Sequence, residues 1–69
     1  MTISVRLNGA DRAVAAATVD ALIAELKIPG APRGLAVAVN GALVPRAHWA
    51  ARDLRAGDAI EIVRATQGG

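Results

Sequence analysis

Hydrophobic and polar side chains alternate at the start of the chain. Residues 2–7 read Thr-Ile-Ser-Val-Arg-Leu, so that every second side chain is apolar. This period of two is typical of a strand with one buried face. The pair Asn8-Gly9 follows directly, and Asn-Gly is the strongest short-range signal of a β-hairpin, because both residues tolerate a positive φ. The chain is therefore expected to open with a hairpin whose returning strand spans residues 12–14.

The period changes to that of a helix after residue 17. Apolar side chains at positions i, i+3, i+4 and i+7 share one helix face: Val19, Leu22, Ile23 and Leu26. Thr18 is expected to cap this helix, and Asp20 lies in the first turn, where a negative charge favours the helix dipole. Lys27 is expected in the last turn. The prolines and glycines between residues 29 and 34 then end the helix in a loop.

The second half of the chain predicts three further strands separated by turns. Residues 35–39 alternate Leu and Val with Ala, and a second Asn-Gly pair follows them. Leu43-Val44 is short and is stopped by Pro45, which suits an edge strand. The remaining elements are a helical turn over 47–51, a turn at Gly57-Asp58 and a final strand over 59–64.

The elements occur in the order strand, strand, helix, strand, short strand, strand. A single helix across one face of a mixed sheet of four to five strands is an α+β arrangement, and this order matches the β-grasp, or ubiquitin-like, fold. In that fold the first and last strands lie side by side in the centre, and their parallel pairing needs the long crossover that the helix provides. Residues 1–64 are therefore expected to form one β-grasp domain, and residues 65–69 a flexible C-terminal tail that ends in Gly-Gly.

Composition narrows the kinds of function that such a domain can have. Cysteine is absent, which excludes disulfides, thiolate metal sites and thiol nucleophiles. The net charge is only +2 and the basic residues form no run, so a nucleic-acid partner is not expected. No apolar stretch approaches the roughly 20 residues of a membrane span, and a signal-peptide pattern is missing. We expect a cytoplasmic protein that does not bind membranes and that is a monomer when free.

The residue types that usually carry catalysis are present but isolated. His48 and Ser4 are the single histidine and serine, and neither has a partner at a recognisable spacing, so metal binding and a nucleophilic triad lack support. Trp49, the single aromatic residue, is expected to pack in the core rather than to anchor a partner. Three carboxylates have spacings that fit turns and a solvent face: Asp53, Asp58 and Glu61. The chain is therefore not expected to be an enzyme.

The last residues offer a different chemistry. Gly68 and Gly69 have no Cβ, so their backbone can thread a narrow cleft in a partner and bring the final carboxylate to a reactive phosphate. A carboxylate is a poor electrophile, and this chain has no residues to install a leaving group such as AMP, so a partner must do it. Two terminal glycines alone also fit a flexible end or a cloning scar. On a β-grasp pattern without cysteine, a carrier loaded at Gly69 becomes the favoured hypothesis.

Several motifs recur, at similar spacing, in one known family. They are Asn8-Gly9, Thr18-Val19, Val37-Ala38-Val39-Asn40-Gly41, Val44-Pro45-Arg46 with Trp49 three residues on, Leu54 with Gly57-Asp58, Ile60-Glu61-Ile62 and Gly68-Gly69. Through them the chain resembles the ThiS family, the sulfur carriers of thiamine thiazole biosynthesis, nearly from end to end. The Val-Pro-Arg-x-x-Trp segment together with the Gly-Gly end is the most discriminating. One departure is the stretch 13–17, where relatives more often have a Gly or Asp turn.

The resemblance implies a function and a set of partners. In this family the terminal glycine is adenylated by an activating enzyme (ThiF-like) that uses ATP, and sulfur then replaces AMP. The resulting thiocarboxylate donates sulfur for thiazole formation with thiazole synthase (ThiG-like). By this resemblance Gly69 carries the adenylate and then the sulfur, while Gly68, Gln67 and Thr66 thread the partner sites. A sulfur-donating protein is a third partner. The chain itself is expected to bind no cofactor and no metal.

Three other functions stay open. The small subunit of molybdopterin synthase shares the fold and the Gly-Gly end, although it is usually longer and has a Pro-containing approach to its tail. A ubiquitin-like protein modifier would join Gly69 to a lysine through an isopeptide bond. An interaction domain would use only the sheet face and would work without the terminal glycines. The short chain and the Val44-Pro45-Arg46 motif favour the thiazole branch.

Overall fold

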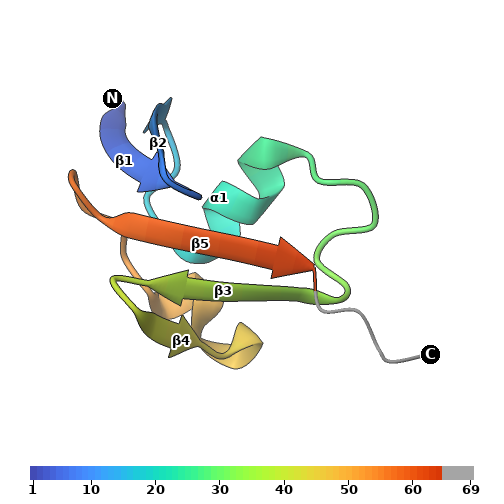
Figure 1. The fold of residues 1–69 in the computed structure, drawn as a ribbon. Helices are drawn as coiled ribbons and strands as arrows, with labels where there is room; N and C mark the ends of the chain where they lie inside the picture. The colour runs from blue at the N-terminus through green and yellow to red at the C-terminus, as the bar shows by residue number, and fades with distance from the viewer. Residues whose placement is uncertain (65–69) are drawn as a thin grey trace.

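The computed structural model describes residues 1–64, which form one mixed sheet of five strands with a helix across one face (Figure 1). The elements in chain order are β1 (Ile3–Leu7), β2 (Ala10–Val14), α1 (Val19–Leu26), β3 (Leu35–Val39), β4 (Ala42–Val44), the 3₁₀ helix η1 (Arg46–Ala51) and β5 (Ala59–Arg64). The expected α+β class and β-grasp order are confirmed. Within residues 1–64 no helix has the length and apolar character of a membrane span.

β5 lies in the middle of the sheet, whose strand order is β2-β1-β5-β3-β4 (Figure 1). It pairs in parallel with β1, where Arg6 lies opposite Ala59 and Leu7 opposite Ile60, and antiparallel with β3. The parallel pair joins the first and last strands, and α1 lies in the crossover between them. Their expected position side by side is confirmed, and it places the end of the described chain on a central strand.

The core lies between α1 and the sheet face that carries the alternating apolar residues. Val5 of β1, Val37 and Val39 of β3 and Ile60 of β5 are each 1% exposed, and Leu22 of α1 is fully buried in the same cluster. Burial of such a side chain stabilises the fold by about 1.5–3 kcal/mol. Successive side chains of a strand point to opposite faces, so the face away from α1 carries polar residues such as Ser4 and Glu61 together with the exposed apolar Leu43 and Val63.

Local side-chain and backbone chemistry sets both ends of α1. At the N-terminus the Thr18 side chain accepts a 3.1 Å hydrogen bond from the Ala21 N–H, which confirms it as the N-cap. Lys27 is not in the last turn, contrary to expectation. It is the C-cap, with a left-handed φ of 52°, and its N–H donates to the Ala24 carbonyl. The helix therefore ends at Leu26, the last residue of the apolar spacing, because the left-handed Lys27 stops the helical hydrogen-bond series.

Both Asn-Gly pairs form the two-residue turns that the sequence predicts. Asn8 and Gly9 have φ angles of 49° and 85°, and Asn40 and Gly41 have φ angles of 52° and 83°. Positive φ at both central residues is the mark of a type I′ turn, whose twist matches that of the flanking strands. Pairing resumes directly after the first turn, so β2 begins at Ala10 rather than at residue 12 as expected.

Trp49 packs in the core within η1. Its side chain is 2% exposed, and its indole Nε1 donates a 2.9 Å hydrogen bond to the Val44 carbonyl. Pro45 separates β4 from η1, which packs against α1. The expectation that this residue fills the core is therefore confirmed, and its hydrogen bond ties η1 to the end of the edge strand.

Candidate functional site

The residues that the sequence assigns to the site follow β5 along the chain. Thr66, Gln67, Gly68 and Gly69 lie outside the described residues, so their roles stay predictions. The structure describes the strand that precedes them, which ends at Arg64 (Figure 1). The structure therefore describes two parts of the candidate site: the contacts that fix β5, and the surface around Arg64.

β3 fixes β5 up to its last residue. The two strands pair antiparallel over five residue pairs, from Val39 opposite Ile60 to Leu35 opposite Arg64. On the other edge of β5, the pairing with β1 stops early, at Leu7 opposite Ile60. Backbone groups beyond that point need another hydrogen-bond partner, because leaving them buried and unpaired costs free energy.

Asn8 supplies this partner. Its backbone N–H donates to the Ile60 carbonyl at 2.8 Å. Its side chain bonds twice to Ile62, because Nδ2 donates to the Ile62 carbonyl at 3.2 Å and Oδ1 accepts from the Ile62 N–H at 2.9 Å. An amide side chain offers the same donor and acceptor as a peptide group. Asn8 therefore extends the β1 ladder by one step and holds β5 close to its C-terminal end.

Asn40 acts in a similar way at the start of β5. Its N–H donates to the Ala59 carbonyl at 2.7 Å, its Oδ1 accepts from the Ala59 N–H at 2.9 Å, and its Nδ2 donates to Asp58 Oδ1 at 3.0 Å. The side chains of the two turns thus hold opposite ends of one strand. The turn pattern alone does not reveal this second role. The sequence does hint at it, because both turns have asparagine where glycine would also accept the positive φ. Asparagine differs from glycine in having a side-chain amide that can form hydrogen bonds.

Asp58 completes the turn before β5. Its Oδ2 accepts a 2.8 Å hydrogen bond from the Arg55 N–H, and its Oδ1 accepts one from Asn40. Partial burial raises the pKa of Asp58, but these hydrogen bonds and the charges of Arg52 and Arg55 outweigh burial, so the pKa lies below its ordinary value. The carboxylate therefore stays ionised at neutral pH, and its expected role in a turn is confirmed.

Replacing Asn8 with glycine is expected to lower the free energy of unfolding by about 1–3 kcal/mol, because two part-buried backbone groups of Ile62 lose their partners. Glycine accepts the positive φ, so the turn itself is not strained. Urea unfolding followed by the fluorescence of Trp49 measures the loss. The matched control is Asn40→Gly, whose side-chain hydrogen bonds are exposed and whose loss should be smaller. Equal losses in the two variants would contradict the role assigned to Asn8.

The isolated candidates for catalysis stay apart in the structure. His48 on η1 and Ser4 on β1 are exposed, and so are Asp53 and Glu61. Within residues 1–64 no group of three or more His, Cys, Asp or Glu side chains is placed to hold a metal ion. Among the described residues, the catalytic candidates named from the sequence are thus not brought together into a site.

Comparisons with known proteins bear on both the domain and the terminus. A model described as the ThiS family matches residues 5–69. The crystal structure of a thiamine biosynthesis protein (ThiS) from Geobacter metallireducens matches with a TM-score of 0.84 and 28% sequence identity, over 97% of this chain and 100% of that chain. None of the curated proteins matches the chain significantly.

Proposed function

Because the chain belongs to the ThiS family, we propose that it is a sulfur carrier of thiamine biosynthesis whose cargo is bound at the carboxylate of Gly69. The observation that carries the proposal is the extent of the family match, which reaches Gly69 and so includes both terminal glycines. The full-length structural match to a thiamine biosynthesis protein supports the same role. In this proposal residues 1–64 are the domain that partners recognise, and residues 65–69 are the carrier tail.

The proposed loading takes two steps, both catalysed by partners. First, a carboxylate oxygen of Gly69 attacks the α-phosphorus of ATP, pyrophosphate leaves, and the terminus becomes an acyl adenylate. Second, a sulfide nucleophile attacks the acyl carbon and AMP leaves, which yields a thiocarboxylate. Splitting the reaction in this way replaces one difficult displacement by two easier ones. ATP would be bound by the activating enzyme, and this chain would hold no cofactor of its own.

The geometry of β5 suits the delivery of a terminal group. The strand is bonded on one edge to β3 as far as Arg64 and on the other to the Asn8 side chain at Ile62. Five residues separate Arg64 from the end of the chain, and five extended residues span at most about 18 Å. Gly69 can therefore lie at most about 18 Å from Arg64. A cleft of the partner that accepts Gly69 can be no deeper than this distance.

Three partners follow from the proposal. They are an activating enzyme that binds ATP, a protein that supplies sulfur, and a thiazole synthase that receives it. The carrier must leave each of them in turn, so the interfaces are expected to be of modest area and short lifetime. The chain then serves as a covalent co-substrate of these proteins rather than as an enzyme.

Intact mass spectrometry tests the proposal. After incubation of the full chain with its activating enzyme, ATP and sulfide, the mass should rise by the difference between a sulfur and an oxygen atom, with pyrophosphate released. The same mixture without ATP is the control and should leave the mass unchanged. No gain, with an enzyme shown to be active on another carrier, would refute the proposal.

The protein that accepts the sulfur distinguishes the thiazole carrier from the other functions that share this fold. Consumption of the thiocarboxylate by thiazole synthase supports the proposal. Consumption by the large subunit of molybdopterin synthase alone would assign the chain to that pathway. Conjugates with lysine residues of other proteins, lost when Gly69 is deleted, would indicate a protein modifier.

A further inference from the structure

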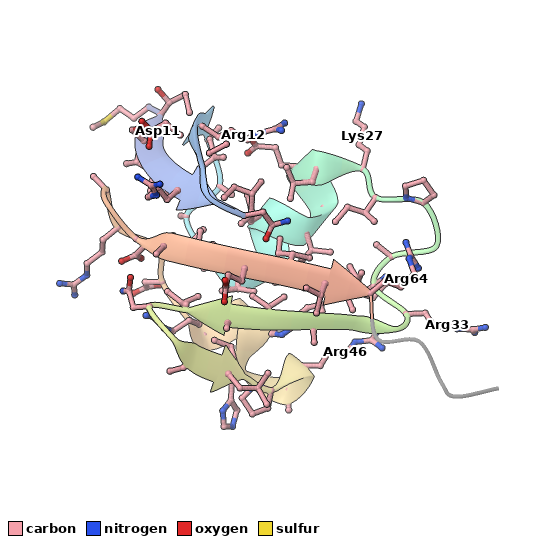
Figure 2. All side chains as sticks on the ribbon, viewed as in Figure 1. Asp11, Arg12, Lys27, Arg33, Arg46 and Arg64 are labelled. Atoms are coloured by element: carbon pink, nitrogen blue, oxygen red, sulfur yellow. The ribbon has the colours of Figure 1, made fainter. Side chains whose placement is uncertain are left out.

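Three arginine side chains gather at the end of the sheet where β5 stops, and a fourth, Arg12, lies opposite Val5 on the first hairpin and lines a hollow with Arg64. They come from four separate segments: Arg12 of β2, Arg33 of the loop between α1 and β3, Arg46 at the start of η1 and Arg64 at the end of β5. All four are exposed. Figure 2 shows Arg33, Arg46 and Arg64 around the last residue of β5 and Arg12 on the first hairpin. These four residues are called the basic end below.

Two separate hollows in the surface are each lined by two residues of the basic end. Arg12 and Arg64 line one of about 340 Å³, and Arg33 and Arg46 line another of about 460 Å³. Arg64 also contacts the loop that forms the second hollow, since its Nη2 donates to the Pro29 carbonyl at 2.5 Å. Neither hollow is lined by an acidic residue among those that the structure describes. The charge around the end of β5 is therefore of one sign.

The remainder of the chain does not share this charge. The net charge of the whole chain is +2, so removing the four arginines of the basic end from the count leaves −2 for all other residues. Asp58, with Arg52 and Arg55 near it, lies at the opposite end of β5. Acidic and basic side chains are thus mixed at the start of β5, whereas the charged residues that line the two hollows are all arginines.

We infer that the basic end docks on an acidic rim around the cleft of the activating enzyme, an inference that rests on the function proposed above. An enzyme that takes hold of Gly69 must approach the surface around Arg64, because only five residues separate Arg64 from the end of the chain. Opposite charge on that enzyme orients the carrier during encounter and raises the association rate. Exposed ion pairs add little to the lifetime of a complex, so the loaded carrier can still leave.

An acidic protein surface fits the basic end better than a nucleic acid does. Proteins that bind single strands combine a basic groove with aromatic side chains on which bases stack. The chain has one aromatic residue, Trp49, and it is 2% exposed. The hollow beside Arg64 is instead lined by aliphatic side chains, among them Leu26 and Leu35. Arginines around aliphatic side chains suit a protein partner with a mixed acidic and apolar surface.

Loading kinetics of charge-reversal variants test the inference. The variant Arg33→Glu/Arg46→Glu changes two exposed residues of one hollow. The control Arg6→Glu/Arg55→Glu changes the charge equally near the start of β5, where the N–H groups of both residues bond to Asp58. Pyrophosphate release by the activating enzyme is measured against the concentration of the full chain. We expect the KM to rise about tenfold for the first variant and less than about twofold for the control, with kcat nearly unchanged in both.

Salt separates an effect of charge from an effect of shape. Raising the ionic strength from about 0.05 M to about 0.5 M should remove most of the difference in KM, because exposed charges are then screened. A difference that persists at high salt would overturn the inference, and so would equal KM values for the two double variants. Circular dichroism establishes that the variants fold. If the glutamate variant does not, Arg33→Gln/Arg46→Gln should still raise the KM about threefold.

Failure of the inference is distinguishable from failure of the proposed function. If the wild-type chain is loaded and the two double variants behave alike, the docking surface is wrong and the carrier function stands. If an activating enzyme that is active on another carrier does not load the wild-type chain, the proposed function and the docking surface are both wrong. Retention of a single-stranded oligonucleotide by the wild-type chain but not by Arg33→Glu/Arg46→Glu, with equal loading of both, would assign the basic end to nucleic acid instead.

Discussion

A chain that lacks Gly69 is expected to be loaded with sulfur at least about 100-fold more slowly than the full chain, while folding normally. Gly68 would then carry the terminal carboxylate, about 3.5 Å short of the position that the full chain reaches. Misplacement of reacting groups by even about 1 Å can cost about 100-fold in rate. The buried core residues that the structure describes all precede Arg64, so the free energy of unfolding should change by less than about 0.5 kcal/mol.

Pyrophosphate release and intact mass measure the loss of loading, and urea unfolding checks the stability. The matched control is Gly69→Ala, which keeps the length and the carboxylate and adds only a Cβ, so its loss should be smaller. The truncated chain keeps residues 1–64 and should compete with the full chain for the activating enzyme. Loading of the truncated chain at the normal rate would show that Gly69 is not the residue that receives sulfur.

Replacing Trp49 with alanine is expected to cost about 3–5 kcal/mol of stability, the usual loss for a buried aromatic side chain. A chain of 69 residues is stable by only about 3–10 kcal/mol in total, so the variant should be marginally folded. The indole is 2% exposed and donates to the Val44 carbonyl, which links η1 to β4. The sequence contains no other aromatic residue that could fill the space.

Far-UV circular dichroism during urea unfolding measures this loss, since the variant has no tryptophan to report it. Trp49→Phe is the control, because it keeps a six-membered aromatic ring while it removes the smaller ring of the indole and the N–H that bonds to Val44. Its loss should be about 1–3 kcal/mol, the cost of an unpaired buried carbonyl together with a small change of volume. A loss below about 1 kcal/mol for Trp49→Ala would mean that the side chain does not support the core.

The elements of this fold are predictable because each depends on a few neighbouring residues. Alternation places β1 and β5, Asn-Gly places the two hairpin turns, Thr18 begins the helix and Pro45 ends the edge strand. The departures are all at boundaries: Lys27 caps the helix, β2 begins at Ala10, β4 at Ala42 and η1 at Arg46. The ends of an element are less sharply marked in the sequence than its interior.

The candidate site is predictable in part. The terminal glycines can be proposed from the sequence because the chemistry proposed for them needs no second residue of the chain. The family match extends to them, and their role stays a prediction. The contact of Asn8 with Ile62 spans 54 positions of sequence, and no local pattern indicates it. It exists because the pairing of β1 with β5 stops at Ile60, the second residue of β5, and leaves backbone groups for the amide to pair with.

The local sequence therefore predicts the strands, the helix and the turns, because periodicity and turn preference are local. The fold decides which of these elements meet. It brings β1 beside β5 and lets the side chains of Asn8 and Asn40 bond to β5. It also collects Arg33, Arg46 and Arg64 around the end of β5. These contacts depend on the crossover and on sheet register, which join segments that are distant along the chain.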